Sequence, residues 1–153
     1  MQEARRILTA RDIMATSLVT FRADQLIYDA IKLLLKHGIS GAPVVDDDRR
    51  LIGILSELDC LRMLSSDEFL GDEQEEGGLV EHFMSTDART IEPEVGVYRI
   101  AHCFMTTAIR RLPVLEDERL IGQVSRRDVL NAIDVMHKKR LVRRRFPDYR
   151  EPA

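Results

Sequence analysis

Hydrophobic positions along the chain follow two periods, and the same succession of periods occurs twice. In the first half, residues 18–21, 42–45 and 51–55 form short apolar runs, which indicate strands. Residues 27–35 carry apolar side chains at i, i+3, i+4, i+7 and i+8, which predicts an amphipathic helix. A second helix is expected around the leucines of residues 58–64. The predicted order is therefore strand, helix, strand, strand, helix.

The second half repeats this order at a displacement of about 70 residues. Residues 12–65 align with residues 82–134, and several chemically distinctive residues match in sequence order: Met14 with Met84, Tyr28 with Tyr98, Pro43 with Pro113, Ser56 with Ser125, and Asp59 with Asp128. We therefore expect a mixed α/β (α+β) fold of two tandem β-α-β-β-α repeats. Within the first repeat, Asp24 is expected to cap the amphipathic helix at its start and Gly38 at its end.

The predicted organisation has four parts. Repeat 1 spans residues 10–66 and repeat 2 spans residues 79–137. Residues 67–78 form an acidic linker, which we interpret as solvated, with a docking site for a partner as the alternative. Residues 138–153 form a basic tail that begins as a continuation of the last helix.

Composition narrows the function only slightly. The chain has 153 residues, of which 44% are hydrophobic, and a formal net charge of -3. No apolar run approaches the roughly 20 residues that cross a bilayer, and the first residues lack the pattern of a signal peptide, so a cytoplasmic location is expected. The absence of Trp disfavours base-stacking surfaces for single-stranded nucleic acid. The four histidines are scattered, and no metal site is expected.

The most informative short pattern is Gly-x-x-Ser-x-x-Asp, which begins at Gly53 and again at Gly122. In both places a strand gives way to a helix, whose first turn offers unpaired N–H groups to a phosphate. An aspartate on that turn can accept the hydroxyl groups of a ribose, and glycine allows a ligand to approach the backbone. The alternative is a simple capping box, which Thr9 and Asp12 also fit. Duplication in matched contexts favours the binding interpretation.

The ordered set of motifs resembles the CBS-domain family over residues 10–137, twice in succession. It includes Asp-Ile-Met near residue 12, the Gly-Ala-Pro-Val-Val segment that starts at Gly41, and Leu-Ile-Gly-Ile-Leu-Ser-Glu-Leu-Asp, which ends at Asp59. The resemblance implies that the two repeats pack about a pseudo-twofold axis and leave two clefts. It implies AMP, ADP, ATP or S-adenosylmethionine as the ligand, with no catalytic cofactor.

The resemblance also implies residue roles. Asp59 and Asp128 would hold ribose hydroxyls, while Ser56 and Ser125 approach the phosphates, and Thr20 and Thr90 would lie near the base. The segments that run up to the two prolines would cradle the adenine or face the phosphates: Ile39, Ser40, Gly41, Ala42 and Pro43, and Ile109, Arg110, Arg111, Leu112 and Pro113.

The two clefts are not expected to be equal. Repeat 2 places four arginines around its motif, namely Arg110, Arg111, Arg126 and Arg127, and guanidinium groups suit phosphate. Repeat 1 has Ser40, Gly41 and Glu57 at the corresponding places. We therefore expect the site of Ser125 and Asp128 to be the stronger one. Alternatively, these arginines belong to an exposed, solvated surface.

These observations predict a regulatory module that senses an adenosine-containing ligand and signals its occupancy to an unidentified partner protein. It is expected to form a homodimer through the apolar faces of its closing helices, residues 58–64 and 129–136. One alternative is a dimeric scaffold with degenerate clefts; another is a nucleic-acid binder that uses the basic tail. An enzyme is not expected, since no nucleophile is paired with a base.

Overall fold

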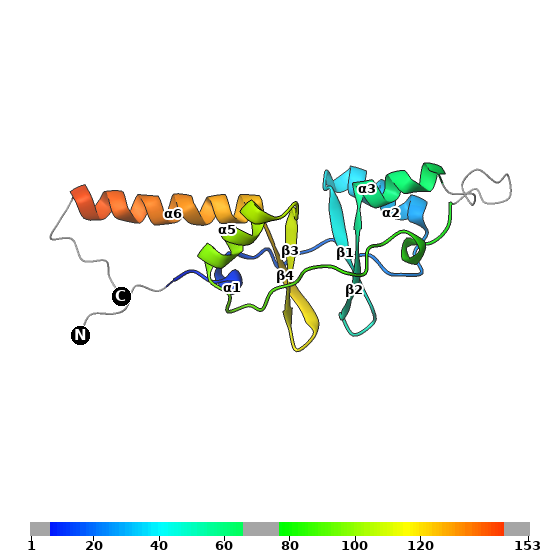
Figure 1. The fold of residues 1–153 in the computed structure, drawn as a ribbon, viewed down its shortest axis with the longest axis horizontal. Helices are drawn as coiled ribbons and strands as arrows, with labels where there is room; N and C mark the ends of the chain where they lie inside the picture. Colours follow the sequence, from blue (N-terminus) through cyan, green and yellow to red (C-terminus); the bar gives the residue numbers. More distant parts are fainter. Residues whose placement is uncertain (1–6, 66–76, 146–153) are drawn as a thin grey trace.

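Two copies of one small α+β unit succeed each other along the chain, as the repeat predicts (Figure 1). The computed structural model describes residues 7–65 and 77–145, with side chains up to residue 140. Most of the predicted acidic linker and the end of the basic tail lie outside these ranges. Among the described helices, none is long and apolar enough to span a bilayer.

Each repeat consists of a helix, a β-hairpin and a closing helix. The first contains α2 (Ile27–His37), β1 (Gly41–Val45), β2 (Leu51–Ser56), α3 (Glu57–Leu61) and the 3₁₀ turn η1 (Arg62–Ser65). The second contains the 3₁₀ turn η2 (Val80–His82), α5 (Val97–Thr106), β3 (Arg111–Glu116), β4 (Arg119–Ser125) and α6 (Arg126–Arg145). A short helix, α1 (Ala10–Ile13), lies at the start of repeat 1. Residues 138–145 thus continue the last helix, as predicted.

The two hairpins share one register. Pro43 faces Ile54 in β1–β2, and Pro113 faces Gln123 in β3–β4. The register of both hairpins shifts directly after the next residue, Val44 or Val114. The hairpins also touch, because the backbone N–H of Leu120 donates to the carbonyl oxygen of Arg49 at 2.9 Å. The two hairpins therefore have the same internal structure and lie in contact.

The predicted strand at residues 18–21 is shorter than expected. Only Phe21 pairs, in a single parallel bridge with Val44, and Ile91 makes the equivalent bridge with Val114. The capping prediction for Asp24 is wrong, because α2 starts after Leu26 and no side chain caps it. The prediction for Gly38 is confirmed: it ends α2 with a φ of 61° and donates to the carbonyl oxygens of Leu34 and Leu35.

The first segment of each repeat is exchanged into the other repeat. Ala15, near the start of repeat 1, pairs with Gln123 of β4, and α1 places Ala10 in the hydrophobic core of repeat 2. Ser85 precedes the first bridge of repeat 2 but pairs with Ile54 of β2, while Val80 lies in the core of repeat 1. Each core is therefore completed by chain from the neighbouring repeat, and the repeats are interlocked.

The glycines of the repeated motif leave room for the exchanged segments to pack against the hairpins. A Cβ at Gly122 would collide with Sδ of Met14 and lie 3.0 Å from the carbonyl oxygen of Ala15. A Cβ at Gly53 would lie 2.8 Å from Sδ of Met84. We expected the glycines to admit a ligand, but the nearest atoms belong to the exchanged segments. Their lack of a side chain lets a methionine pack against the hairpin.

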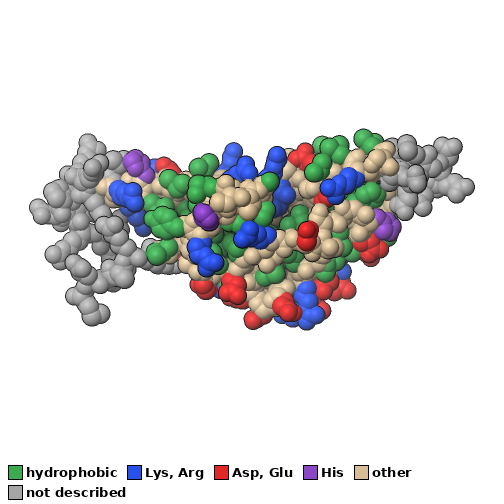
Figure 2. Space-filling view, in the orientation of Figure 1, with side chains coloured by type: hydrophobic (Ala, Val, Ile, Leu, Met, Phe, Trp, Pro, Cys, Tyr) green, Lys and Arg blue, Asp and Glu red, His purple; other side chains and the backbone are tan. Residues whose placement is uncertain are grey.

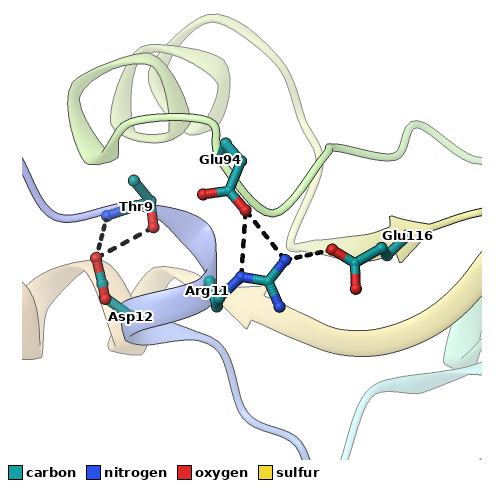
Figure 3. A network of polar contacts seen from close by, with 5 residues as sticks. All are labelled: Thr9, Arg11, Asp12, Glu94 and Glu116. Atoms are coloured by element: carbon teal, nitrogen blue, oxygen red, sulfur yellow. Dashed lines mark hydrogen bonds and ion pairs between the residues drawn. The ribbon is translucent and has the colours of Figure 1, made fainter.

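Polar contacts anchor the N-terminal segment to repeat 2 (Figure 3). The Arg11 guanidinium donates to Oε1 of Glu94 at 3.0 and 3.2 Å and also to Glu116, which lies at the end of β3. Thr9 and Asp12 form the capping box of α1, with the Thr9 N–H 2.8 Å from Oδ2 of Asp12. The exchange is thus fixed by ion pairs as well as by apolar packing.

The helices expose apolar side chains on the surface away from the hairpins. In α3 and η1 the leucines at positions 58, 61 and 64 are each about 60% exposed, and in α6 Leu130 and Ile133 are at least half exposed. The predicted apolar face of residues 129–136 therefore divides, since Val129 and Ala132 lie in the core of repeat 2. Figure 2 shows apolar side chains along the edge that carries α3 and α6.

Candidate functional site

The two hairpins turn one face toward each other. Along each strand alternate side chains point to opposite faces, and Val44, Val114 and Val124 point into the cores. Their neighbours Pro43 and Pro113 point the other way, yet both are almost fully buried. These prolines are therefore covered at the junction of the repeats, which is where the segments predicted to bind the ligand meet.

Arg111 crosses this junction. Its guanidinium donates to the hydroxyl of Ser40 in repeat 1, and a Cβ at Gly41 would lie 2.5 Å from Nη1 of Arg111. Burial, reinforced by the neighbouring Arg110, lowers the pKa of Arg111 from its ordinary value, while Glu57 opposes this shift. None of the described carboxylates forms an ion pair with Arg111. The junction therefore holds a partly desolvated cation beside a hydroxyl, a setting that suits a phosphate.

Both Ser-x-x-Asp motifs form capping boxes. The N–H of Ser56 donates to Oδ2 of Asp59 at 2.9 Å, and the N–H of Asp59 donates back to the Ser56 hydroxyl oxygen at 3.1 Å. Ser125 and Asp128 repeat this pattern at 2.8 and 3.3 Å. Capping occupies one carboxylate oxygen of each aspartate, so only Oδ1 remains for a ligand. We call the turn with Ser56 and Asp59 the first site and the turn with Ser125 and Asp128 the second site.

The remaining carboxylate oxygen, Oδ1, accepts hydrogen bonds from side chains in the first site only, within the described residues. Asp59 is 3% exposed, and its Oδ1 accepts from Nη1 of Arg62 and from the Ser85 hydroxyl, each at 3.2 Å. In the second site, Asn131 and Ala15 stand where Arg62 and Ser85 stand in the first. Within the described part of the chain, no hydrogen bond or ion pair reaches Oδ1 of Asp128. Of the two aspartates, Asp128 is therefore the one whose Oδ1 can accept a hydrogen bond from a ligand.

The other predicted residues vary in accessibility. Ile39, Ile109 and Thr20 are half-buried, whereas Thr90, Arg110 and Arg126 are exposed. Ala42 and Leu112 belong to the two hydrophobic cores, so their side chains point away from the junction and leave only backbone groups to face it. The structure thus brings together Ser40, Gly41 and Arg111 from opposite repeats.

Three polar residues of the sites were missed from the sequence. Ser85 and Arg62 hold Asp59. Gln123 lies on β4, and its buried Oε1 has no hydrogen-bond partner among the described residues. Gln123 could have been noticed as the polar residue in the otherwise apolar run from Leu120 to Val124. Ser85 could not, because its place beside Asp59 depends on the exchange.

The charge distribution favours an anion at the junction. Figure 2 shows Lys and Arg side chains gathered in the middle of the molecule, on the helix side of the strands. Acidic side chains are more frequent along the opposite edge, near the hairpin turns. A negatively charged ligand would therefore be drawn to the region where the repeats meet.

Comparison with known proteins places both repeats in one family. The family model described as CBS domain matches residues 10–66 and 80–135. A CBS domain-containing protein of Dictyostelium discoideum is 33% identical over 130 residues, which cover 80% of this chain and 89% of that protein. The chain spans only 42% of the length of an uncharacterized Methanocaldococcus jannaschii relative and 14% of an A-adding tRNA nucleotidyltransferase of Aquifex aeolicus.

Solved structures share the fold. Arabidopsis thaliana CBSX2, crystallised in complex with AMP, is 26% identical with a TM-score of 0.75, and the match covers 85% of this chain and 98% of that one. The CBS domain pair of protein MJ0100, in complex with 5'-methylthioadenosine and S-adenosylmethionine, is 25% identical with a TM-score of 0.68, covering 82% and 98%. The predicted fold of two tandem repeats is thereby confirmed.

Proposed function

Because this chain belongs to the CBS-domain family, we propose that it is a regulatory module that binds an adenosine-containing ligand and signals occupancy to a partner protein. CBS pairs are generally regulatory rather than catalytic. Two structural neighbours at 25% identity or above were crystallised, one with AMP and the other with 5'-methylthioadenosine and S-adenosylmethionine. Adenosine is the part that these ligands share, and it is the chemistry that we assign to this chain.

The observation that carries the proposal is the free carboxylate oxygen of Asp128, which lies in the strand-to-helix turn that follows β4. A carboxylate can accept both hydroxyls of a ribose. On the paired strand, Arg111 is the cross-strand partner of Ser125 and reaches Ser40 of the other repeat. Asp128 would hold the ribose while Arg111 and Ser40 bind the phosphate, so the second site is the one that we expect to fill.

Such a ligand would bridge the two repeats, since Ser40 and Asp128 belong to different ones. Binding would favour the arrangement in which both groups reach the ligand, and a partner that distinguishes the two arrangements would detect occupancy. AMP, ADP and ATP are the candidates with a phosphate for Arg111. S-adenosylmethionine instead carries a positively charged sulfonium group on the 5'-carbon of its ribose. This positive charge fits Arg111 less well than a phosphate does.

The module is further proposed to form a homodimer through its helices. The exposed apolar residues occur at matching positions in the two repeats: Tyr28 and Leu35 in α2, and Tyr98 and Met105 in α5. We assign these side chains, together with the exposed leucines of α3 and η1, to the interface with a second copy. The alternative is a dimer whose two sites bind no ligand. A ligand that raises the Tm in the experiment below would exclude it.

The test is thermal unfolding of the full chain with AMP, ADP, ATP, S-adenosylmethionine and, as a non-adenosine control, GMP. A ligand at about 100 times its Kd adds about 2.7 kcal/mol, which raises the Tm by about 5–10 °C. The wild type and Asp12→Asn should respond equally, because Asp12 belongs to the capping box of α1 and is not assigned to the ligand; Asp128→Asn should lose the response. If no adenosine compound raises the wild-type Tm, the proposal is wrong.

A further inference from the structure

The side chain of Gln123 presents an unused hydrogen-bond acceptor. Its Oε1 is buried and, among the described residues, has no donor. The backbone of Gln123 is fully engaged, with its N–H and C=O both bonded to Ala15 at 3.0 and 2.9 Å. A buried acceptor without a partner destabilises the folded chain, and such groups in native proteins call for an explanation.

Gln123 lies on the same face of its hairpin as the residues assigned to the ligand. It is the cross-strand partner of Pro113, and Arg111 pairs with Ser125 two residues further along. On a strand, residues two apart share a face at a spacing of about 7 Å, which is the scale of a purine ring. Gln123 therefore lies on the face of the proposed ligand, two strand positions from the pair of Arg111 and Ser125.

Repeat 1 shows what this position is like without a polar group. The residue that corresponds to Gln123 is Ile54, the cross-strand partner of Pro43. Packing at this position is thus satisfied by an aliphatic side chain, and the amide in repeat 2 is not required for the fold. The amide stands in the repeat whose aspartate has a free oxygen.

We propose that Gln123 selects the base of the ligand, with Oε1 accepting a hydrogen bond from the exocyclic amine of adenine. This assignment rests on the proposed function and names its specificity-determining residue. Hypoxanthine and guanine carry a carbonyl oxygen where adenine carries that amine, so they would place an acceptor against an acceptor in a buried site. The site should therefore reject 6-oxopurines that are otherwise identical to its ligand.

The test compares AMP with IMP by isothermal titration of the full chain, because the two share ribose and phosphate and differ at the 6-position. The wild type is expected to bind AMP at least about tenfold more tightly than IMP. In Gln123→Ile, which copies repeat 1, AMP binding weakens while IMP binding does not, so the ratio falls to within about threefold. Gln123→Leu serves as a second variant if Gln123→Ile unfolds.

Thermal unfolding without ligand gives an independent readout. Since the variants remove an unpaired buried acceptor, their Tm should equal or exceed that of the wild type. Equal binding of AMP and IMP by the wild type, or an unchanged ratio in both folded variants, would overturn the assignment of Gln123 while leaving the nucleotide site intact. If the wild type binds neither nucleotide, the proposed function fails first, and this assignment falls with it.

Discussion

The hydroxyl of Ser85 lies 3.2 Å from Oδ1 of Asp59, a residue 26 positions earlier in the chain. The contact exists because the segment that leads into repeat 2 is exchanged into repeat 1, where Ser85 pairs with Ile54. Ala15 takes the equivalent place beside β4 and has no hydroxyl to donate. Two motifs that share their glycine, serine and aspartate therefore differ in whether the aspartate can receive a ligand.

Releasing Asp59 should create a second binding site. The variant Arg62→Asn with Ser85→Ala gives the first site the residues of the second, and a free Oδ1 with it. Because Glu57 stands near this site and disfavours phosphate, the ligand to titrate is adenosine. The number of adenosine molecules bound per chain should rise from one to two in isothermal titration.

Each single substitution is the matched control, since one donor to Asp59 remains in place. Arg62 is exposed, so its loss should cost no more than about 1 kcal/mol of stability. If the double variant folds but still binds one adenosine, some other feature closes the first site.

Adding one methyl group at Gly122 should weaken the interlock of the repeats. In Gly122→Ala the new Cβ would meet both Met14 and the backbone at Ala15. Forcing these apart costs about 1–3 kcal/mol, measurable by urea unfolding. Gly96→Ala is the control, because its Cβ would meet only Ile7 at 3.4 Å. Equal stability of the two variants would contradict the packing role of Gly122.

Cys60 should be slow to react with thiol reagents. Burial, followed by the charges of Asp59 and Glu57, raises the pKa of Cys60 to about 11. Since the thiolate is the nucleophile, the alkylation rate of Cys60 should keep rising beyond pH 9 and level off near pH 11. The measurement uses iodoacetamide with Cys103→Ser. A plateau near pH 8.5, the ordinary thiol value, would show that Cys60 is not desolvated.

A charge on the exposed helix surface should prevent the proposed dimer. In Leu61→Glu a carboxylate replaces a side chain that is 61% exposed and would be buried between two copies, at a cost of several kcal/mol. Sedimentation velocity should then show a monomer where the wild type is a dimer. Arg89→Glu, an exposed charge on a loop, should leave the dimer intact. A monomeric wild type at tens of micromolar would rule the interface out.

The sequence by itself determined the repeat and the elements within it. Periods of two and 3.6 set which residues form hairpins and helices, and local chemistry such as the left-handed turn at Gly38 needs no distant partner. The capping boxes of Ser56 and Ser125 were equally local. These features depend on residues a few positions apart, so they can be predicted from the sequence alone.

Only the tertiary structure decided which repeat each leading segment completes and which aspartate is free. Both outcomes depend on contacts between residues far apart in the chain, such as Ala15 with Gln123. No local sequence pattern predicts such a pairing. The predicted strand before each helix is reduced to one bridge, at Phe21 with β1 and at Ile91 with β3, while the exchanged segments pair with the other edge of each hairpin. The sequence distinguished the two sites by the arginines of repeat 2, and the exchange of segments added the difference in the hydrogen bonds of their aspartates.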